Sequence, residues 1–271
     1  MSMTGADKNM TGIKSWKKFR TTVRSSGYEL FHSLGEFPDA VLVTGCQRSG
    51  TTILARIISQ SEGMRTYAFT DDDELDAALI LSGQITGMPN ARYCFQTTYM
   101  YDHLNEYVER VAGQKIIWVL RNPRSVVCSM LYNWKTSALN ELFMGCGIRY
   151  LTEPYRYRLQ RFGALGVPRL IRASLSYRAK LDEVFFLRDR LPESVLTIVD
   201  YDDMVNAKHR MLPDIYANIG LDYKPEYGER LRSTSLEKAS RLADDARMMI
   251  DAICLDIYQS ARRLINIKAD L

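Results

Sequence analysis

The amino-acid sequence predicts an α/β fold in which a central parallel β-sheet is flanked by helices. Short apolar runs of strand length alternate with segments of helical periodicity, and this strand-then-helix order recurs four times in the chain of 271 residues. Because parallel strands are joined by crossover helices, both faces of such a sheet are covered. An added helical segment precedes the last strand, and a long helix is expected near the C-terminus.

The predicted elements can be placed by residue number. The strands are expected at 40–44, 93–97, 115–120 and 195–199. The helices that follow them are expected at 51–60, at 101–111, from 123 onward and at 204–219. The added helical segment covers 150–190, and the C-terminal helix covers 236–267. We expect a single domain over 1–271, with a basic leader, loose or helical, at about 1–24 and the core at about 39–221.

The composition excludes several classes of protein. A hydrophobic content of 46% supports a sizeable core, and a net charge of +4 is small for a protein that coats nucleic acid. No apolar run approaches the roughly 20 residues that span a bilayer. The five cysteines are widely spaced and include no C-x-x-C pair, which favours neither a disulfide framework nor a zinc site. We therefore expect a cytoplasmic monomer or homodimer without a metal, nucleic-acid or membrane partner.

The most informative motif is Gly-Cys-Gln-Arg-Ser-Gly-Thr-Thr, which follows the first predicted strand. Its glycines allow a tight turn with inward-pointing backbone N–H groups, and the next helix adds the positive end of its dipole. We therefore expect a P-loop-like anion site formed by Arg48, Ser49, Gly50, Thr51 and Thr52. A nucleoside-triphosphate loop would have Lys in place of Thr51. The alternative is a glycine turn with an incidental arginine.

A second motif follows the third predicted strand. Asn122 is a good N-cap and Pro123 a good first helical residue, so Arg121 should end the strand. Ser129 lies two helical turns after the cap and should face the strand end that carries Arg121. An arginine and a hydroxyl at a helix N-terminus form a second anion pocket. The alternative is a well-capped helix whose arginine is solvated.

At these two motifs the sequence resembles the sulfotransferase family that uses 3′-phosphoadenosine 5′-phosphosulfate (PAPS). The family's 5′-phosphosulfate loop has Lys or Arg followed by Ser-Gly-Thr-Thr, and its 3′-phosphate motif has Arg and, eight residues later, Ser. The resemblance covers about 39–221 and implies transfer of a sulfuryl group to a hydroxyl or amine of a small molecule. It also implies that Arg48 stabilises charge on the bridging oxygen, while Arg121 and Ser129 bind the 3′-phosphate.

Two further parts of the resemblance are weaker. The stretch Val-Asp-Tyr-Asp-Asp-Met after the fourth strand is similar to the family's scaffold, and we assign its Tyr201 and Asp202 no chemistry. A glycine-rich adenine loop near the C-terminus is not visible. Tyr177 and the stretch 232–235 are therefore the candidates for adenine contacts.

The general base is not where many family members have it. Those members place a Lys and a His after the second strand, where this chain has Gln96, Thr97 and Thr98. Other members use a carboxylate after the helix that follows the first loop. This chain offers four carboxylates there and one histidine beyond the second strand: Asp71, Asp72, Asp73, Glu74 and His103.

The acidic run allows two interpretations. A carboxylate in a partly buried cleft has its pKa raised toward the range of a base. Acidic residues after Thr70 are equally typical of a capped helix start, and His103 is equally typical of a surface or core histidine. Four carboxylates beside an anion-binding cleft also favour a cationic, natural-product-like acceptor over a polyanionic one.

Two other functions remain open from the sequence. A small-molecule kinase would use the loop at Gly45 for ATP, but it would need a lysine at Thr51 and a magnesium-binding carboxylate at a strand end. A non-catalytic nucleotide-binding module would keep the donor cleft and lack the base. The absence of a histidine directly after the second strand, where Gln96, Thr97 and Thr98 stand, keeps this second alternative open.

Overall fold

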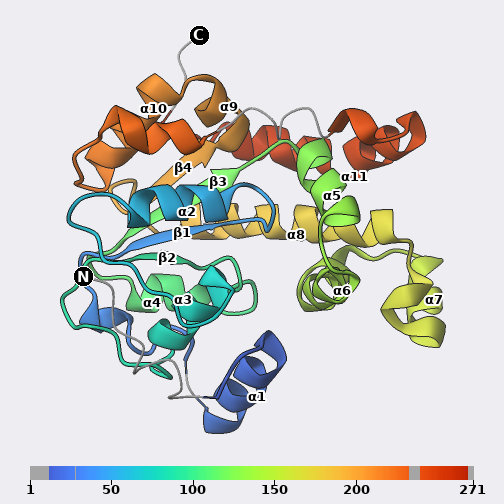
Figure 1. The fold of residues 1–271 in the computed structure, drawn as a ribbon. Helices are drawn as coiled ribbons and strands as arrows, with labels where there is room; N and C mark the ends of the chain where they lie inside the picture. The colour runs from blue at the N-terminus through green and yellow to red at the C-terminus, as the bar shows by residue number, and fades with distance from the viewer. Residues whose placement is uncertain (1–11, 28, 232–238, 268–271) are drawn as a thin grey trace.

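The part of the chain that the structure describes is built around a sheet of four parallel strands, which confirms the predicted fold class (Figure 1). The structure is a computed structural model that describes residues 12–27, 29–231 and 239–267. The strands are β1 (Val41–Gly45), β2 (Cys94–Gln96), β3 (Lys115–Leu120) and β4 (Leu196–Asp200). They lie in the order β2-β1-β3-β4 and are all parallel.

Alternate residues of the strands pack on opposite faces of the sheet. On β3, Trp118 and Ile116 are fully buried in one apolar cluster, whereas Ile117 is fully buried in the other. A strand that is buried on both faces needs apolar residues at every position, because successive side chains point to opposite sides. This requirement explains why the strands appear in the sequence as continuous apolar runs.

Helices cover both faces (Figure 1). The Trp118 face packs against α1 (Trp16–Ser26), α3 (Asp73–Leu81), α4 (Leu104–Arg110), α5 (Pro123–Tyr132), α6 (Thr136–Gly145), α8 (Arg169–Arg188) and α11 (Asp244–Arg262). The Ile117 face packs against α2 (Thr51–Ser59), α9 (Tyr201–Asn206) and α10 (Lys208–Asn218). The added segment predicted at 150–190 consists of η3 (Gly147–Tyr150), α7 (Tyr155–Phe162), η4 (Gly163–Gly166) and α8.

The predicted leader contains a helix that belongs to the core. Phe19 and Val23 of α1 are 1% and 5% exposed and pack in the cluster that contains Trp118. Helix α1 begins after Ser15, whose hydroxyl accepts a hydrogen bond from the backbone of Lys18, and it ends at a left-handed Gly27. The described part of the leader is therefore structural.

Three predicted helices differ from the observed ones in extent. The segment at 204–219 is broken at Ala207 into α9 and α10, although neither Gly nor Pro stands at the break. The C-terminal helix α11 begins only at Asp244, after an extended Ala243, and ends at Arg262; residues 236–238 of the prediction lie outside the described part. Helix α4 is shorter than the predicted 101–111, because it begins only after its N-cap, His103, and ends at Arg110.

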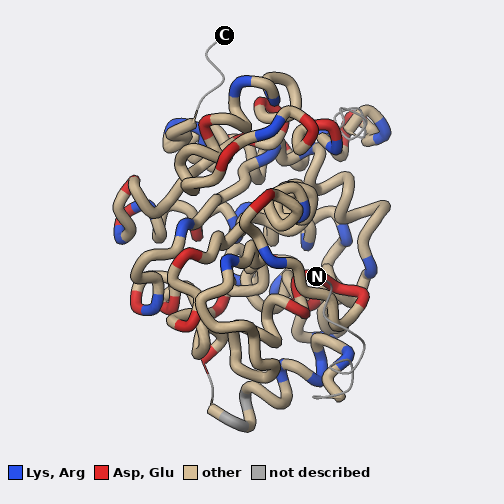
Figure 2. The backbone as a smooth tube through the Cα atoms, turned by 60° about the vertical axis from the view of Figure 1, so that its left-hand side comes forward, with Lys and Arg blue, Asp and Glu red and all other residues tan. Residues whose placement is uncertain are grey.

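The carboxyl ends of all four strands lie at one edge of the sheet, where ligands bind in open α/β folds. Both sequence motifs and the loop after β2 start at this edge. Basic and acidic residues are interspersed over the fold (Figure 2). Within the described residues, none of the helices combines the length and the apolar character needed to cross a membrane.

Candidate active site

The loop after β1 takes a conformation that depends on two glycines. Gly45 has φ 141°, and a Cβ there would lie 2.5 Å from the Val119 carbonyl oxygen of the neighbouring strand. Gly50 has φ 100°, and a Cβ there would overlap the ring of Tyr201. Arg48, between them, has a left-handed φ of 74°. A turn this close to its neighbours leaves the backbone N–H groups at the start of α2 accessible to an anion.

The structure brings the two sequence motifs into one site. The Nε of Arg48 donates a hydrogen bond to the Ser129 Oγ over 3.0 Å, and Arg121 Nη1 donates to the Arg48 carbonyl oxygen over 3.4 Å. Burial and the positive charge of Arg121 both lower the pKa of the Arg48 guanidinium. Two neighbouring cations repel each other unless an anion lies between or beside them. The arrangement is therefore suited to an anionic ligand.

Arg121 is fixed by residues that follow β4. Its Nε donates to the Asp202 carboxylate over 3.3 Å, and its guanidinium lies 4.6 Å from the ring centre of Tyr201. The second Asp202 oxygen accepts from the backbone N–H of Asn122 at 3.2 Å. Sequence reasoning gave Tyr201 and Asp202 no role beyond the scaffold. Their direct contacts with Arg121 show that they orient a side chain of the site.

Tyr177 lies beneath the site and not at its surface. The side chain is fully buried, and its hydroxyl donates to the Arg121 carbonyl oxygen over 2.7 Å. This position is contrary to the predicted adenine contact, because a buried ring has no surface to offer a ligand. The other adenine candidate, the stretch 232–235, lies outside the described residues.

The hydroxyl groups of the loop differ in their partners. Within the described part of the chain, the buried Ser49 Oγ has no hydrogen-bond partner, which is costly unless a ligand or water completes it. The buried Thr51 Oγ1 accepts from Gln96 Nε2 over 3.2 Å. Thr52 is exposed and lines a cleft with Arg48. The Ser49 hydroxyl is therefore available to bind a polar ligand.

Three of the four carboxylates of the acidic run stabilise the start of α3 or lie at the surface. Asp72 is the N-cap of α3, where it accepts from the backbone N–H of Glu74 at 3.1 Å, and its other oxygen accepts from Trp16 Nε1 at 2.9 Å. Asp73 pairs with Arg56. Asp71 is exposed. The expected capped helix start is thus present, with Asp72 as its cap.

Glu74 differs from the other three because its carboxylate points into the protein. It accepts a hydrogen bond from Thr98 Oγ1, in the loop after β2. Burial raises the pKa of Glu74 to about 7, although the Thr98 hydrogen bond and the charges of Lys180 and Arg20 oppose this rise. A carboxylate with a pKa near neutrality is suited to accept a proton at physiological pH.

His103 does not line the cleft that contains Arg48 and Glu74. Its Nδ1 lies 2.9 Å from a Glu106 carboxylate oxygen and its Nε2 lies 3.9 Å from Asp102, at the start of α4. The cavities that His103 lines are not lined by Arg48. Of the predicted base candidates, the half-buried Glu74 is the one that both lines the cleft of Arg48 and accepts a hydrogen bond from the loop after β2.

Two clefts meet at Glu74. One has a volume of about 820 Å³ and is lined by Arg48, Thr52 and the acidic run; the other has about 640 Å³ and extends along α6. The residues common to both are Ser15, Trp16, Asp72, Glu74, Trp134 and Lys135. The ion pair of Arg20 with Glu141 joins α1 to α6 over the second cleft. Across the described ranges, no group of three or more His, Cys, Asp or Glu side chains could hold a metal ion.

Solved structures of sulfotransferases share this fold. A sulfotransferase from Alicyclobacillus acidocaldarius is 14% identical, with a TM-score of 0.51 over 84% of this chain and 96% of that chain. The sulfotransferase domain of the Synechococcus PCC 7002 olefin synthase is 14% identical, with a TM-score of 0.51 over 84% and 95%. A mouse sulfotransferase complexed with PAP is 17% identical, with a TM-score of 0.50 over 87% and 92%.

A comparison with curated proteins gave no match. The family model of the sulfotransferase domain matches residues 38–243, which include both anion-binding motifs, the loop after β2 and the start of α9. This match covers most of the chain and agrees with the geometry at the carboxyl edge of the sheet. The chain therefore belongs to the sulfotransferase domain family.

Proposed function

We propose that the chain transfers a sulfuryl group from PAPS to a hydroxyl or amine of a small-molecule acceptor, with Glu74 as the general base. The observation that carries this proposal is that Glu74 and Arg48 line the same cleft, while Arg48 contacts the second motif through Ser129. An anion site and a base of suitable pKa thus lie within one space. The family supports the reaction, and the PAP complex of the mouse relative supports the donor.

The two motifs divide the donor between them. In the proposal, the backbone and hydroxyls of 49–52 bind the 5′-phosphate, and the orphaned Ser49 Oγ gains its missing partner. Arg121 and Ser129 bind the 3′-phosphate, with Arg121 held by Asp202. Arg48 belongs to the first motif and contacts Ser129 of the second. In the proposal it stabilises the negative charge that develops on the bridging oxygen as the bond to sulfur breaks. No metal is needed for this division of roles.

Glu74 acts on the acceptor. Sulfuryl transfer, like phosphoryl transfer, depends on in-line approach and on charge stabilisation, and a base removes the acceptor's proton. The Thr98 hydrogen bond fixes one carboxylate oxygen of Glu74, which leaves the other to take the proton. The acceptor oxygen or nitrogen then forms its bond to sulfur as the bond from sulfur to the bridging oxygen breaks.

The acceptor is proposed to lie where the two clefts meet. Trp16 and Trp134 line both clefts, Tyr99 and Tyr101 line the second one, and these rings suit a flat or apolar body. A cationic, natural-product-like acceptor finds support in the Asp72 carboxylate, which caps α3 and lines both clefts. The support is smaller than the acidic run alone suggests, because the Asp73 carboxylate is neutralised by Arg56.

The proposal is tested by incubation of the full chain with PAPS and a pool of phenols, alcohols and amines. We expect PAP to form together with a product that carries one additional SO₃ group, as measured by mass spectrometry. ATP in place of PAPS should give no phosphorylated product. PAP binding without transfer to any member of the pool would favour the non-catalytic module.

Replacement of Arg121 by Ala should weaken PAP binding by about 1.5 to 3 kcal/mol, the range for a hydrogen bond to a charged group. Ser129→Ala should weaken it less, because a neutral hydroxyl is lost. Isothermal titration calorimetry measures both effects. Since Arg121→Ala also removes the ion-pair partner of Asp202, Asp202→Asn is the control for lost orientation alone. Wild-type affinity in both Arg121→Ala and Ser129→Ala would make the second motif purely structural.

A further inference from the structure

A buried ion pair on α8 has no part in the proposed chemistry. Lys180 and Glu183, one turn apart on α8, are paired, and their side chains are only 1% and 2% exposed. Removing two charges from water costs several kcal/mol per ion before their attraction is counted. Within the described residues, Glu183 Oε1 has no hydrogen-bond partner. Stability alone is therefore a weak reason for this pair.

Lys180 is connected to Glu74 through one residue. Its ammonium donates a hydrogen bond to the Thr98 carbonyl oxygen over 3.1 Å. The same carbonyl oxygen accepts from Gln47 Nε2, in the loop after β1, at 3.0 Å. The Thr98 hydroxyl donates to the Glu74 carboxylate. Thr98 thus joins the anion-binding loop, the buried ammonium and the proposed base.

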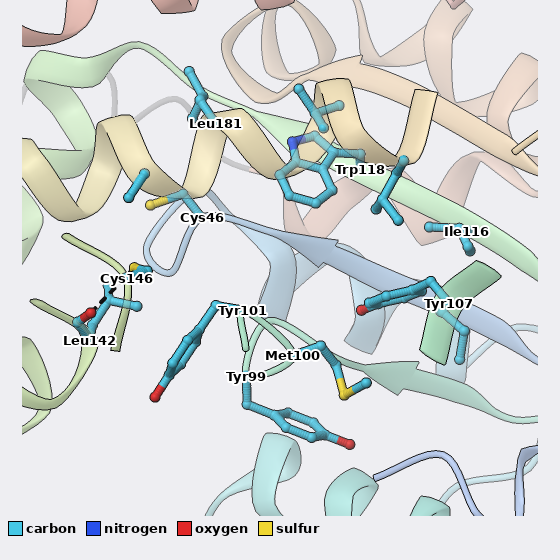
Figure 3. Close-up of a cluster of buried hydrophobic side chains, with 14 of the residues drawn as sticks. Cys46, Tyr99, Met100, Tyr101, Tyr107, Ile116, Trp118, Leu142, Cys146 and Leu181 are labelled. Atoms are coloured by element: carbon cyan, nitrogen blue, oxygen red, sulfur yellow. Dashed lines mark hydrogen bonds between the residues drawn. The ribbon is translucent and has the colours of Figure 1, made fainter. Parts of the chain in front are cut away.

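The surroundings of Lys180 leave it little freedom to move. Its Nζ lies 5.8 Å from the ring centre of Tyr101 and 5.8 Å from that of Trp118. Figure 3 shows the Trp118 ring beside α8, which carries the labelled Leu181, while the Tyr101 ring lies farther from this helix in the view. An ammonium held between two rings and a carbonyl keeps a fixed distance from Glu74.

We propose that Lys180, with Glu183, is a positioning residue of this enzyme: its ammonium fixes Thr98 against the proposed base and places a positive charge near the Glu74 carboxylate. The inference rests on the proposed role of Glu74. Burial drives Glu74 toward its neutral form, in which it cannot accept a proton. A cation held nearby opposes that effect, and Glu183 limits how strongly it does so.

Other charged and titratable groups also face this network. Glu74 is faced by Asp72 at the N-cap of its helix, by Arg20 of α1, by Lys180 of α8, by Tyr99 and by Tyr107 of α4, which also faces Glu183. Lys180 and Glu183 are faced by Cys46, Cys146, Arg149 and Asp102, and burial raises the pKa of Glu183 to about 7. These groups are the same in all the variants described below. A difference in the Glu74 titration between variants is therefore caused by the change in the Lys180–Glu183 pair.

The two members of the pair should act on Glu74 in opposite directions. Lys180→Met removes the cation, so the pKa of Glu74 should rise by at least about half a pH unit at the effective dielectric of a protein interior. Glu183→Gln leaves the ammonium uncompensated, so the pKa of Glu74 should fall. Opposite shifts from two substitutions on one helix are not expected of a general loss of packing.

The experiment is a ¹³C NMR titration of the full chain labelled at the glutamate carboxyl carbons, with Glu74 assigned by the signal that Glu74→Gln removes. Lys115→Met is the matched control. The Lys115 ammonium also donates to a carbonyl oxygen, that of Ser194, but Lys115 is the first residue of β3 and lies at the edge of the sheet opposite the site. It should leave the Glu74 titration unchanged. Far-UV circular dichroism checks that each variant folds.

The results separate this inference from the function. Opposite shifts in Lys180→Met and Glu183→Gln support the inference, and Lys180→Arg should restore the wild-type titration. An unchanged Glu74 titration in folded Glu183→Gln would overturn the inference even if Lys180→Met fails to fold. Retained turnover in Glu74→Gln would instead overturn the proposed base, and it leaves the titration result standing as a measured coupling.

Discussion

Replacement of Glu74 by Gln is expected to lower turnover by about a hundredfold or more, the usual scale for loss of a general base, with PAP affinity nearly unchanged. The amide keeps the size and can keep the Thr98 hydrogen bond, but it cannot take a proton. The turnover number at saturating PAPS and the calorimetric affinity for PAP measure the two effects. A loss of turnover without a loss of donor affinity is typical of a residue that acts in the transition state.

Asp73→Asn is the matched control for Glu74→Gln. It makes the same kind of change in the first turn of α3, on a carboxylate that pairs with Arg56. It should cost at most about 1 kcal/mol of stability and leave turnover within a few-fold of wild type. If Asp73→Asn lost activity as strongly as Glu74→Gln, the acidic run would act as a whole and no single base could be assigned.

The pH dependence of turnover tests independently whether Glu74 is the general base. A base works only when it is deprotonated, and burial raises the pKa of Glu74 to about 7. Turnover should therefore increase with pH through about 7 and level off above it. In Glu74→Gln this limb should be absent. A wild-type rate that falls as the pH rises from 6 to 8 would assign the proton transfer to another group.

Replacement of Arg48 by Ala should lower turnover by about a hundredfold to a thousandfold, the range for removal of one donor to a developing anion. PAP affinity should fall by a smaller factor, because negative charge accumulates on the bridging oxygen mainly in the transition state. Pre-steady-state PAP formation at saturating PAPS separates the two effects. Arg48→Ala also removes a structural contact, because the Ser129 Oγ loses the hydrogen bond that the Arg48 Nε donates over 3.0 Å.

Arg56→Ala is the control for Arg48→Ala. Arg56 lines the same cleft from α2, but its guanidinium is paired with Asp73. It should bind PAP and turn over within a few-fold of wild type. Should Arg48→Ala keep full turnover at saturating PAPS and lose only affinity, Arg48 would be a binding residue, and the proposed charge stabilisation would be wrong.

The parts of the fold that could be predicted are those with local causes. The strands are continuous apolar runs, and the helix at Pro123 begins at the Asn122 cap that the sequence indicates. The loop after β1 needs glycines at two positions, so its shape is also encoded locally. The order of the strands could not be predicted from local patterns, because it depends on pairing between residues far apart in the chain.

The parts that could not be predicted depend on long-range contacts. Asp202 orients Arg121 from 81 positions away, and Lys180 reaches the Thr98 carbonyl oxygen from 82 positions away. The four carboxylates of the acidic run look alike in the sequence, and only burial against the loop after β2 distinguishes Glu74. The core role of α1 was missed for the same reason, since its apolar residues meet partners from many elements.

The central claim, a donor site made for PAPS, is tested most directly by calorimetric titration of the full chain with PAP, AMP and ATP in the absence of metal. We predict that PAP binds at least about a hundredfold more tightly than AMP, because charge-assisted hydrogen bonds from Arg121 and Ser129 to the 3′-phosphate are worth about 3 kcal/mol or more together. Equal affinity for PAP and AMP would contradict the account, and tighter binding of ATP would contradict it as well.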